Sequence, residues 1–103
     1  MTARFAMKVH KNYGGSKVVA VSDYDLLGRT LEDKKKNLEI TISKVFYGEQ
    51  EFRIEDVLQF IKHTDNVNLI GNDIVDLAIK EKLIDERSVI TIAGIKHAQI
   101  YSV

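Results

Sequence analysis

Alternating apolar and polar positions predict two strands at the start of the chain. Residues 5–10 alternate with a period of two, which is typical of a half-buried strand, and the side chains expected to face the core are Phe5, Met7 and Val9. Residues 17–21 are almost wholly apolar, which favours a strand inside a sheet. The segment Asn12-Tyr13-Gly14-Gly15-Ser16 between them is a turn signal, because glycine adopts positive φ freely. We therefore predict a hairpin.

The middle of the chain gives weaker signals. Ser22-Asp23 can cap a short helix over residues 24–27, with Gly28 just beyond its end. Residues 29–36 are expected to form an exposed connection with Lys34–Lys36 at its tip, and residues 37–42 alternate as a third strand. Residues 43–51 are ambiguous, since apolar side chains there are followed by the helix-breaking Gly48.

Two amphipathic helices follow. Ile54, Val57, Leu58 and Ile61 have the i, i+3, i+4, i+7 spacing of one helical stripe, which ends at Asp65-Asn66. Residues 67–71 are expected to be a short extended or turn segment. Asn72 is then the predicted cap of a second helix, whose core positions are Ile74, Leu77 and Ala78.

The chain ends with a second predicted hairpin. Residues 89–92 and 98–101 are expected strands around a three-residue turn at 93–95, which would place Ile90 beside Ala98. The predicted order is thus β-β-α-β-α-α-β-β. This order indicates an α+β fold, with a mainly antiparallel sheet packed on one face by two principal helices.

Composition limits the class of protein. The 103 residues form a single domain, 1–103, and 15 Lys+Arg balance 15 Asp+Glu, which argues against a strongly cationic nucleic-acid coat and an acidic tail. The absence of cysteine excludes disulfides, cysteine-based zinc sites and iron–sulfur clusters. No apolar run has the length of a membrane helix, and the first residues are too polar for a signal peptide. We expect a cytoplasmic protein with no membrane partner.

Catalytic and cofactor motifs are missing from the sequence. His10, His63 and His97 are too far apart for a local metal-binding pair, and no nucleotide-binding glycine loop or nucleophile elbow is present. Gly14-Gly15-Ser16-Lys17 joins two strands instead of opening a helix, so it is better explained as a hairpin turn than as a phosphate loop. We expect no metal and no cofactor.

One candidate ligand site is the start of the second helix. Free backbone N–H groups at a helix N-terminus can bind an anion, and Asn68 and Asn72 would add amide donors. Asp73 counts against an anion there. The alternative is a capped helix start in which Gly71 provides a tight turn.

The last strand carries a second candidate. Strand alternation places His97, Gln99 and Tyr101 on one face. An imidazole can act as a general acid or base, so His97 is the one catalytic candidate, and this polar row can also meet unpaired bases. The alternative is a solvated face or a polar network that fixes the hairpin.

Basic residues gather near the N-terminus. No acidic residue precedes Asp23, and the candidate nucleic-acid-binding residues are Arg4, Lys8, His10 and Lys17. Lysines on an exposed strand also discourage edge-to-edge aggregation, which is the alternative explanation.

The order and spacing of several motifs resemble a family of small archaeal proteins of about this chain's length, described as a domain of unknown function. The motifs follow the basic hairpin: Asp25-Leu26-Leu27-Gly28, Phe46-Tyr47-Gly48, Asn68-Leu69-Ile70-Gly71 and Gly94-Ile95-Lys96-His97-Ala98-Gln99. Lys96 stands where the family often has proline. The resemblance covers nearly the whole chain and implies an archaeal cytoplasmic protein, but no particular activity. It directs attention to Asn68, Gly71, His97 and Gln99.

Two functional hypotheses follow. The first is a non-enzymatic accessory protein that binds RNA or a ribonucleoprotein, around translation and with help from a protein partner. The second is a small enzyme or ligand-binding domain in which Asn68, Gly71, Asn72 and Gln99 hold an anionic ligand beside His97, which transfers a proton. We favour the first, because no catalytic motif is present. The sequence leaves the oligomeric state open.

Overall fold

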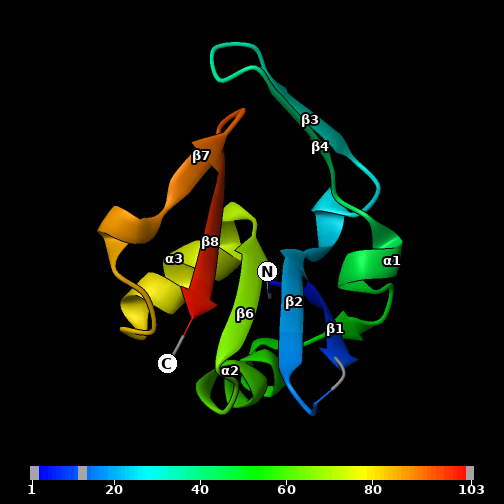
Figure 1. The fold of residues 1–103 in the computed structure, drawn as a ribbon, viewed down its shortest axis with the longest axis vertical. Helices are drawn as coiled ribbons and strands as arrows, with labels where there is room; N and C mark the ends of the chain where they lie inside the picture. The colour runs from blue at the N-terminus through cyan, green and yellow to red at the C-terminus, as the bar shows by residue number, and fades with distance from the viewer. Residues whose placement is uncertain (1–2, 12–13, 102–103) are drawn as a thin grey trace.

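A six-stranded sheet, seen in a computed structural model that describes residues 3–11 and 14–101, forms the centre of the molecule (Figure 1). Its strand order is β5-β1-β2-β6-β8-β7, and β3 and β4 form a separate two-stranded sheet. In chain order the elements are β1 (Phe5–Lys11), β2 (Lys17–Asp23), β3 (Thr30–Asp33), β4 (Leu38–Thr41), α1 (Lys44–Tyr47), β5 (Glu51–Phe52), α2 (Ile54–Lys62), β6 (Asn66–Ile70), α3 (Asn72–Lys80), β7 (Ile90–Ile92) and β8 (Ile95–Tyr101), with 3₁₀ turns at Tyr24–Leu26 and Glu86–Ser88.

The predicted first hairpin and the fold class are confirmed. β1 and β2 pair antiparallel from Phe5↔Asp23 to Lys11↔Lys17, and β2 lies inside the sheet as expected. The predicted turn includes Asn12 and Tyr13, which lie outside the described residues. The sheet is mainly antiparallel, and β2 and β6 form its one parallel pair within the described ranges. Both predicted helices are present as α2 and α3, although α2 ends at Lys62.

Residues 66–70 have a central position in the sheet that the sequence did not indicate. They form the strand β6, which lies between β2 and β8, instead of a short extended or turn segment. Val67, Leu69 and Ile70 are all buried, because helices cover one face of this strand and the β3–β4 layer covers part of the other. A strand buried on both faces shows little alternation, which explains why its pattern was weak.

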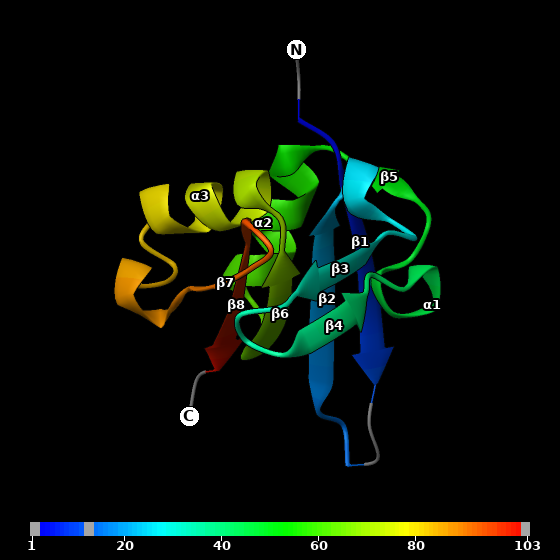
Figure 2. The same cartoon turned by 90° about the horizontal axis from the view of Figure 1, so that it is seen from above.

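The sheet is covered on both faces, whereas the sequence predicted helices on one face only. α2 and α3 pack against the face that carries Val19, Val21 and Leu69. The β3–β4 hairpin, α1 and the first 3₁₀ turn pack against the other face, over Ala20 and Ile70 (Figure 2). The predicted exposed connection at residues 29–36 was therefore wrong in part. Residues 30–33 form β3.

The second predicted hairpin exists, but its predicted register is wrong. Ile92 pairs with Ile95, so the turn has two residues, and Ile90 pairs with His97 instead of Ala98. The turn residues Ala93 and Gly94 have φ of 51° and 81°. Two positive φ values are required by the tight hairpin turn whose twist matches that of the flanking strands.

Candidate nucleic-acid interface

Part of the second sheet face is left uncovered by the β3–β4 hairpin. In Figure 2 the hairpin crosses in front of the sheet, and β1 and β2 extend beyond it. The strand ends that extend carry His10 on β1, Val18 on β2, Asn66 on β6 and Tyr101 on β8, and all four are partly or fully exposed. This region, which we call the open face, is made of the side chains of His10, Val18, Asn66, Asn68, Gln99 and Tyr101 together with Phe46 of α1.

The strand register places the polar row of β8 on this face. Asn68 pairs with Gln99, Asn66 pairs with Tyr101, and Ala20 of β2 pairs with Asn68. Paired residues share a face of the sheet, so the predicted common side of His97, Gln99 and Tyr101 is the side on which Asn66 and Asn68 also lie. The sequence analysis missed Asn66, although it is two residues before Asn68 on the same strand.

Hydrogen bonds hold these amides in fixed orientations. Gln99 Nε2 donates to Asn66 Oδ1 over 3.1 Å, and the Tyr47 hydroxyl donates to Asn68 Oδ1 over 2.7 Å. Burial raises the pKa of Tyr47 to about 12, so its hydroxyl remains a donor. Among the described residues, these bonds leave the Nδ2 groups of both asparagines and Gln99 Oε1 without a side-chain hydrogen bond. The open face therefore presents both donors and an acceptor.

His97 lies at the covered end of the same row. Its Nδ1 donates to Leu69 O over 2.8 Å, and it is partly buried. This bond fixes the ring against β6.

Aromatic side chains lie at both edges of the open face. Phe46 stacks on the His10 ring with centroids 4.8 Å apart and planes 17° apart, and it remains 36 % exposed. Tyr101, on β8, is 72 % exposed. Two aromatic groups separated by a row of amides form a surface on which unpaired bases can stack and hydrogen-bond.

The four predicted basic residues do not form one surface. Lys8 and His10 lie on the open-face side, where Lys8 Nζ donates to Val45 O and His10 Nε2 to Phe46 O, over 2.8 and 2.7 Å. Lys17 lies two residues before the buried Val19 on the same strand, so both side chains point to the helix-covered side. Arg4 forms an ion pair with Glu51 over 2.8 Å and lies 5.3 Å from the centre of the Tyr24 ring.

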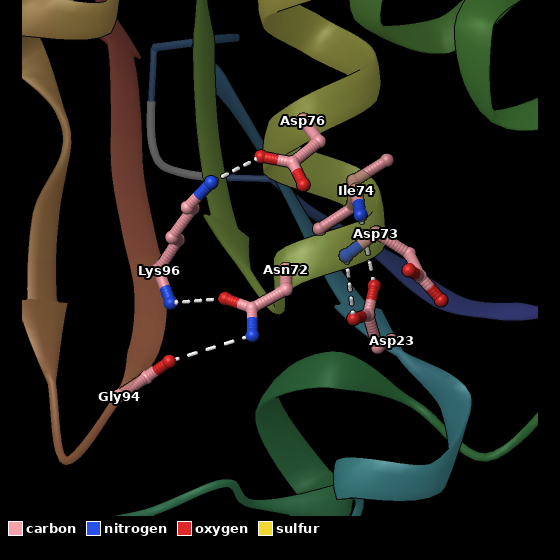
Figure 3. Close-up of polar contacts among 7 residues, drawn as sticks. All are labelled: Asp23, Asn72, Asp73, Ile74, Asp76, Gly94 and Lys96. Atoms are coloured by element: carbon pink, nitrogen blue, oxygen red, sulfur yellow. Dashed lines mark hydrogen bonds and ion pairs between the residues drawn. The ribbon is translucent and has the colours of Figure 1, made fainter.

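The start of α3 is capped by a distant carboxylate. Asp23 accepts from the backbone N–H of Asp73 at 3.0 Å and of Ile74 at 2.9 Å (Figure 3). Gly71 is required there, because a Cβ on it would lie 2.2 Å from Asp23 Cγ. Burial raises the pKa of Asp23 to about 6, although the two backbone N–H bonds act in the opposite direction. The predicted role of Asp23 as a cap for residues 24–27 was wrong, since its side chain makes no cap bond there.

Asn72 does not cap α3 as predicted. Gly71 occupies the cap position, and the Asn72 side chain links the helix to β8: its Oδ1 accepts from Lys96 N at 2.9 Å and its Nδ2 donates to Gly94 O at 3.4 Å (Figure 3). Lys96 Nζ also bonds to Asp76 of α3 at 2.5 Å. These contacts bring His97 close to the helix start, as the ligand-binding hypothesis requires. However, an anion at the helix start would meet the Asp23 carboxylate on the same N–H groups.

Residues 3–11 and 14–101 contain neither a membrane-spanning helix nor a metal-binding cluster. No helix in these ranges is long and apolar enough to cross a membrane. The same ranges contain no group of three or more histidine, aspartate or glutamate side chains that could hold a metal ion.

Comparison with known proteins places the chain in a family. A family model described as "Protein of unknown function (DUF424)" matches residues 10–103. The chain belongs to the DUF424 family. Its fold is similar to a crystal structure of an uncharacterized conserved protein from Methanopyrus kandleri, with a TM-score of 0.77 and 23 % identity over 98 % of this chain and 93 % of that one. No match was found among curated proteins. The DUF424 assignment confirms the resemblance inferred from the motifs, and the structural match shows the fold.

Proposed function

We propose that the protein binds single-stranded RNA on its open face, as a non-enzymatic accessory protein for an RNA or a ribonucleoprotein. The observation that carries the proposal is the row of oriented amides between two exposed aromatic side chains. The proposal includes the archaeal, cytoplasmic setting that the family resemblance implies. The translation machinery is the first place to look for the RNA.

The chemistry of the open face suits unpaired bases better than duplex RNA. A duplex hides its base faces, so stacking on Phe46 and Tyr101 is available only to a single strand. The Asn66 and Asn68 Nδ2 groups can donate to base carbonyls, and Gln99 Oε1 can accept from exocyclic amines. Since both asparagine oxygens are already bonded within the protein, these groups are oriented before RNA binds.

The positive charge needed for phosphates is local, because the chain as a whole has no net charge. Lys11 and Lys17 pair across the end of the β1–β2 hairpin, on the helix-covered side of the sheet, and both are exposed, so they can contact the phosphates of a strand that passes the end of this hairpin. We expect RNA binding with a modest salt dependence, since few lysines contact phosphates.

The proposal is tested by the fluorescence anisotropy of short labelled oligoribonucleotides at low salt. Gln99→Ala removes the outward acceptor and the bond that orients Asn66. Its matched control is Gln50→Ala, which removes an exposed amide between α1 and β5. We expect Gln99→Ala to weaken single-strand binding by about tenfold and Gln50→Ala to leave it unchanged.

Three results would contradict the proposal. One is the absence of binding to any single-stranded sequence at low salt. Another is an equal effect of the two glutamine variants, which would show that the RNA binds elsewhere. The third is a duplex that competes as well as a single strand, which would show that base stacking plays no part.

A further inference from the structure

A pocket of about 620 Å³ opens at the amino-terminal ends of the parallel strands β2 and β6. In Figure 1 these strand ends lie beside α2. The pocket is lined by residues of all three elements, of β8 and of the segment after α2, among them Lys17, Val18, Phe60, His63, Asn66 and Tyr101. Val18, Asn66 and Tyr101 also belong to the open face. The pocket is therefore continuous with the proposed RNA surface.

The lining of the pocket suits a flat, partly apolar group. Phe60 is 47 % exposed, although Ile54, Val57 and Ile61 of the same helix pack into the core, and Tyr101 is more exposed still. Val9 and Val18 add apolar surface to the lining. A volume of this size is typical of small-ligand sites and accommodates one nucleotide. Two exposed rings at one pocket offer stacking surfaces that every nucleobase can use.

The pocket carries charged groups of both signs. Lys17 supplies a cation, and Asp65 supplies a carboxylate. A phosphodiester within an RNA strand carries one negative charge, with which Lys17 can form an ion pair. Gln59 and Asn66 also line the pocket and can hydrogen-bond to the edge of a base.

We infer that this pocket holds one unpaired nucleobase of the bound RNA, with Lys17 contacting the phosphodiester of that nucleotide. The inference rests on the proposed function and extends it to a specific subsite. It also gives Lys17 a role that the open face cannot, because Lys17 belongs to the opposite side of the sheet. The strand then continues past Tyr101 to the amides of Asn68 and Gln99.

The first test is an NMR titration of the full-length, ¹⁵N-labelled protein with a dinucleoside monophosphate, which carries a single phosphodiester. We expect the largest amide shifts at Ser16, Phe60, His63 and Asn66. This measurement needs no variant, so it does not depend on how a substitution affects folding.

The second test measures the affinity for a single-stranded oligoribonucleotide. Phe60→Ala is compared with Ile90→Ala, which removes a similarly exposed apolar side chain, 49 % against 47 %, from the edge strand β7. We expect about a tenfold loss for Phe60→Ala and none for the control. Lys17→Gln is compared with Lys80→Gln on α3. We expect only Lys17→Gln to reduce the slope of log affinity against log salt, by about 0.7.

The outcomes separate the pocket from the open face. If the wild-type protein binds RNA and Gln99→Ala weakens binding, but Phe60→Ala and Lys17→Gln do not, the pocket is overturned and the proposed function stands. If shifts and losses occur only at the pocket, the inference stands and the open-face proposal fails. If no oligonucleotide binds and the titration gives no shifts, both fail.

Discussion

Replacing Asp23 with alanine removes the acceptor of two backbone N–H groups at the start of α3. The Asp23 carboxylate accepts from them at 3.0 and 2.9 Å, and the second belongs to the fully buried Ile74. A buried donor left without a partner costs about 1–3 kcal/mol, whereas water can replace part of the bond at the exposed Asp73. We therefore expect Asp23→Ala to lower the free energy of unfolding by about 3 kcal/mol in mild acid.

This loss should become smaller as the pH rises. Burial raises the pKa of Asp23 from 3.8 to about 6, so the folded protein keeps a proton that the unfolded chain has released. The favourable contribution of Asp23 is then complete below the unfolded pKa and decreases as the pH rises through about 6. This difference between the folded and unfolded pKa values corresponds to about 3 kcal/mol of stability, which screening by nearby solvent reduces to about 1–2 kcal/mol. At neutral pH the loss in Asp23→Ala should therefore be about 1–2 kcal/mol.

Urea unfolding followed by circular dichroism, at several pH values between about 4 and 7, measures both effects. Asp56→Ala is the matched control, because it removes an exposed carboxylate on α2 that is not among the groups acting on Asp23, and it should leave both effects unchanged. The reasoning would be refuted if the difference in free energy of unfolding between the wild type and Asp23→Ala increased with pH. It would mean that the two N–H bonds outweigh burial and hold the pKa of Asp23 below 3.8.

Three further changes follow from the backbone geometry. Gly71→Ala should lower the free energy of unfolding by about 3 kcal/mol, because its methyl group would overlap the Asp23 carboxylate and its φ is +127°; an unchanged urea midpoint would contradict this. Ala93→Asn should raise the free energy of unfolding by about 0.5 kcal/mol, since an Asn-Gly pair fits the two positive φ values of that turn better; thermal unfolding checks this. The Ala93 N–H donates to Asp33 and lowers the pKa of that carboxyl, so the bond is present at neutral pH and lost as the pH falls. The Ala93 amide shift should therefore titrate in acid, and Asp33→Asn should abolish the titration.

Local patterns predicted most of the elements. The first hairpin, α2 and α3 each follow from apolar spacing within about ten residues, which alternation and helical periodicity report directly. β3 was missed because Leu31 is its only apolar residue, although that side chain is buried. α1 was left ambiguous. Its start depends on a single cap, the Ser43 hydroxyl, which accepts from Val45 N and Phe46 N.

The candidate site was predicted less completely, because it depends on contacts between distant segments. Alternation correctly placed His97, Gln99 and Tyr101 on one side of a strand. It could not show that α1 would lie over Lys8 and His10, because the apolar pattern of residues 43–51 did not distinguish a helix from a strand. The sequence did contain the signal that places Lys17 and Lys8 on opposite faces of the sheet. Lys17 lies two residues before Val19, so the two side chains point to the same, helix-covered face.

The parallel pairing of β2 with β6 has a consequence for how the molecule folds. Every strand on one side of this pair comes from the first half of the chain, and every strand on the other side comes from the second. The bond from Asp73 to Asp23 crosses this junction between residues 50 apart in sequence, and the bond from Ala93 to Asp33 crosses between residues 60 apart. Each half can form its antiparallel hairpin early, but the core closes only when the two halves meet, which is a slow step for contacts so distant in sequence. The two halves should therefore unfold together, and two fragments divided between them should gain stable structure only after they associate.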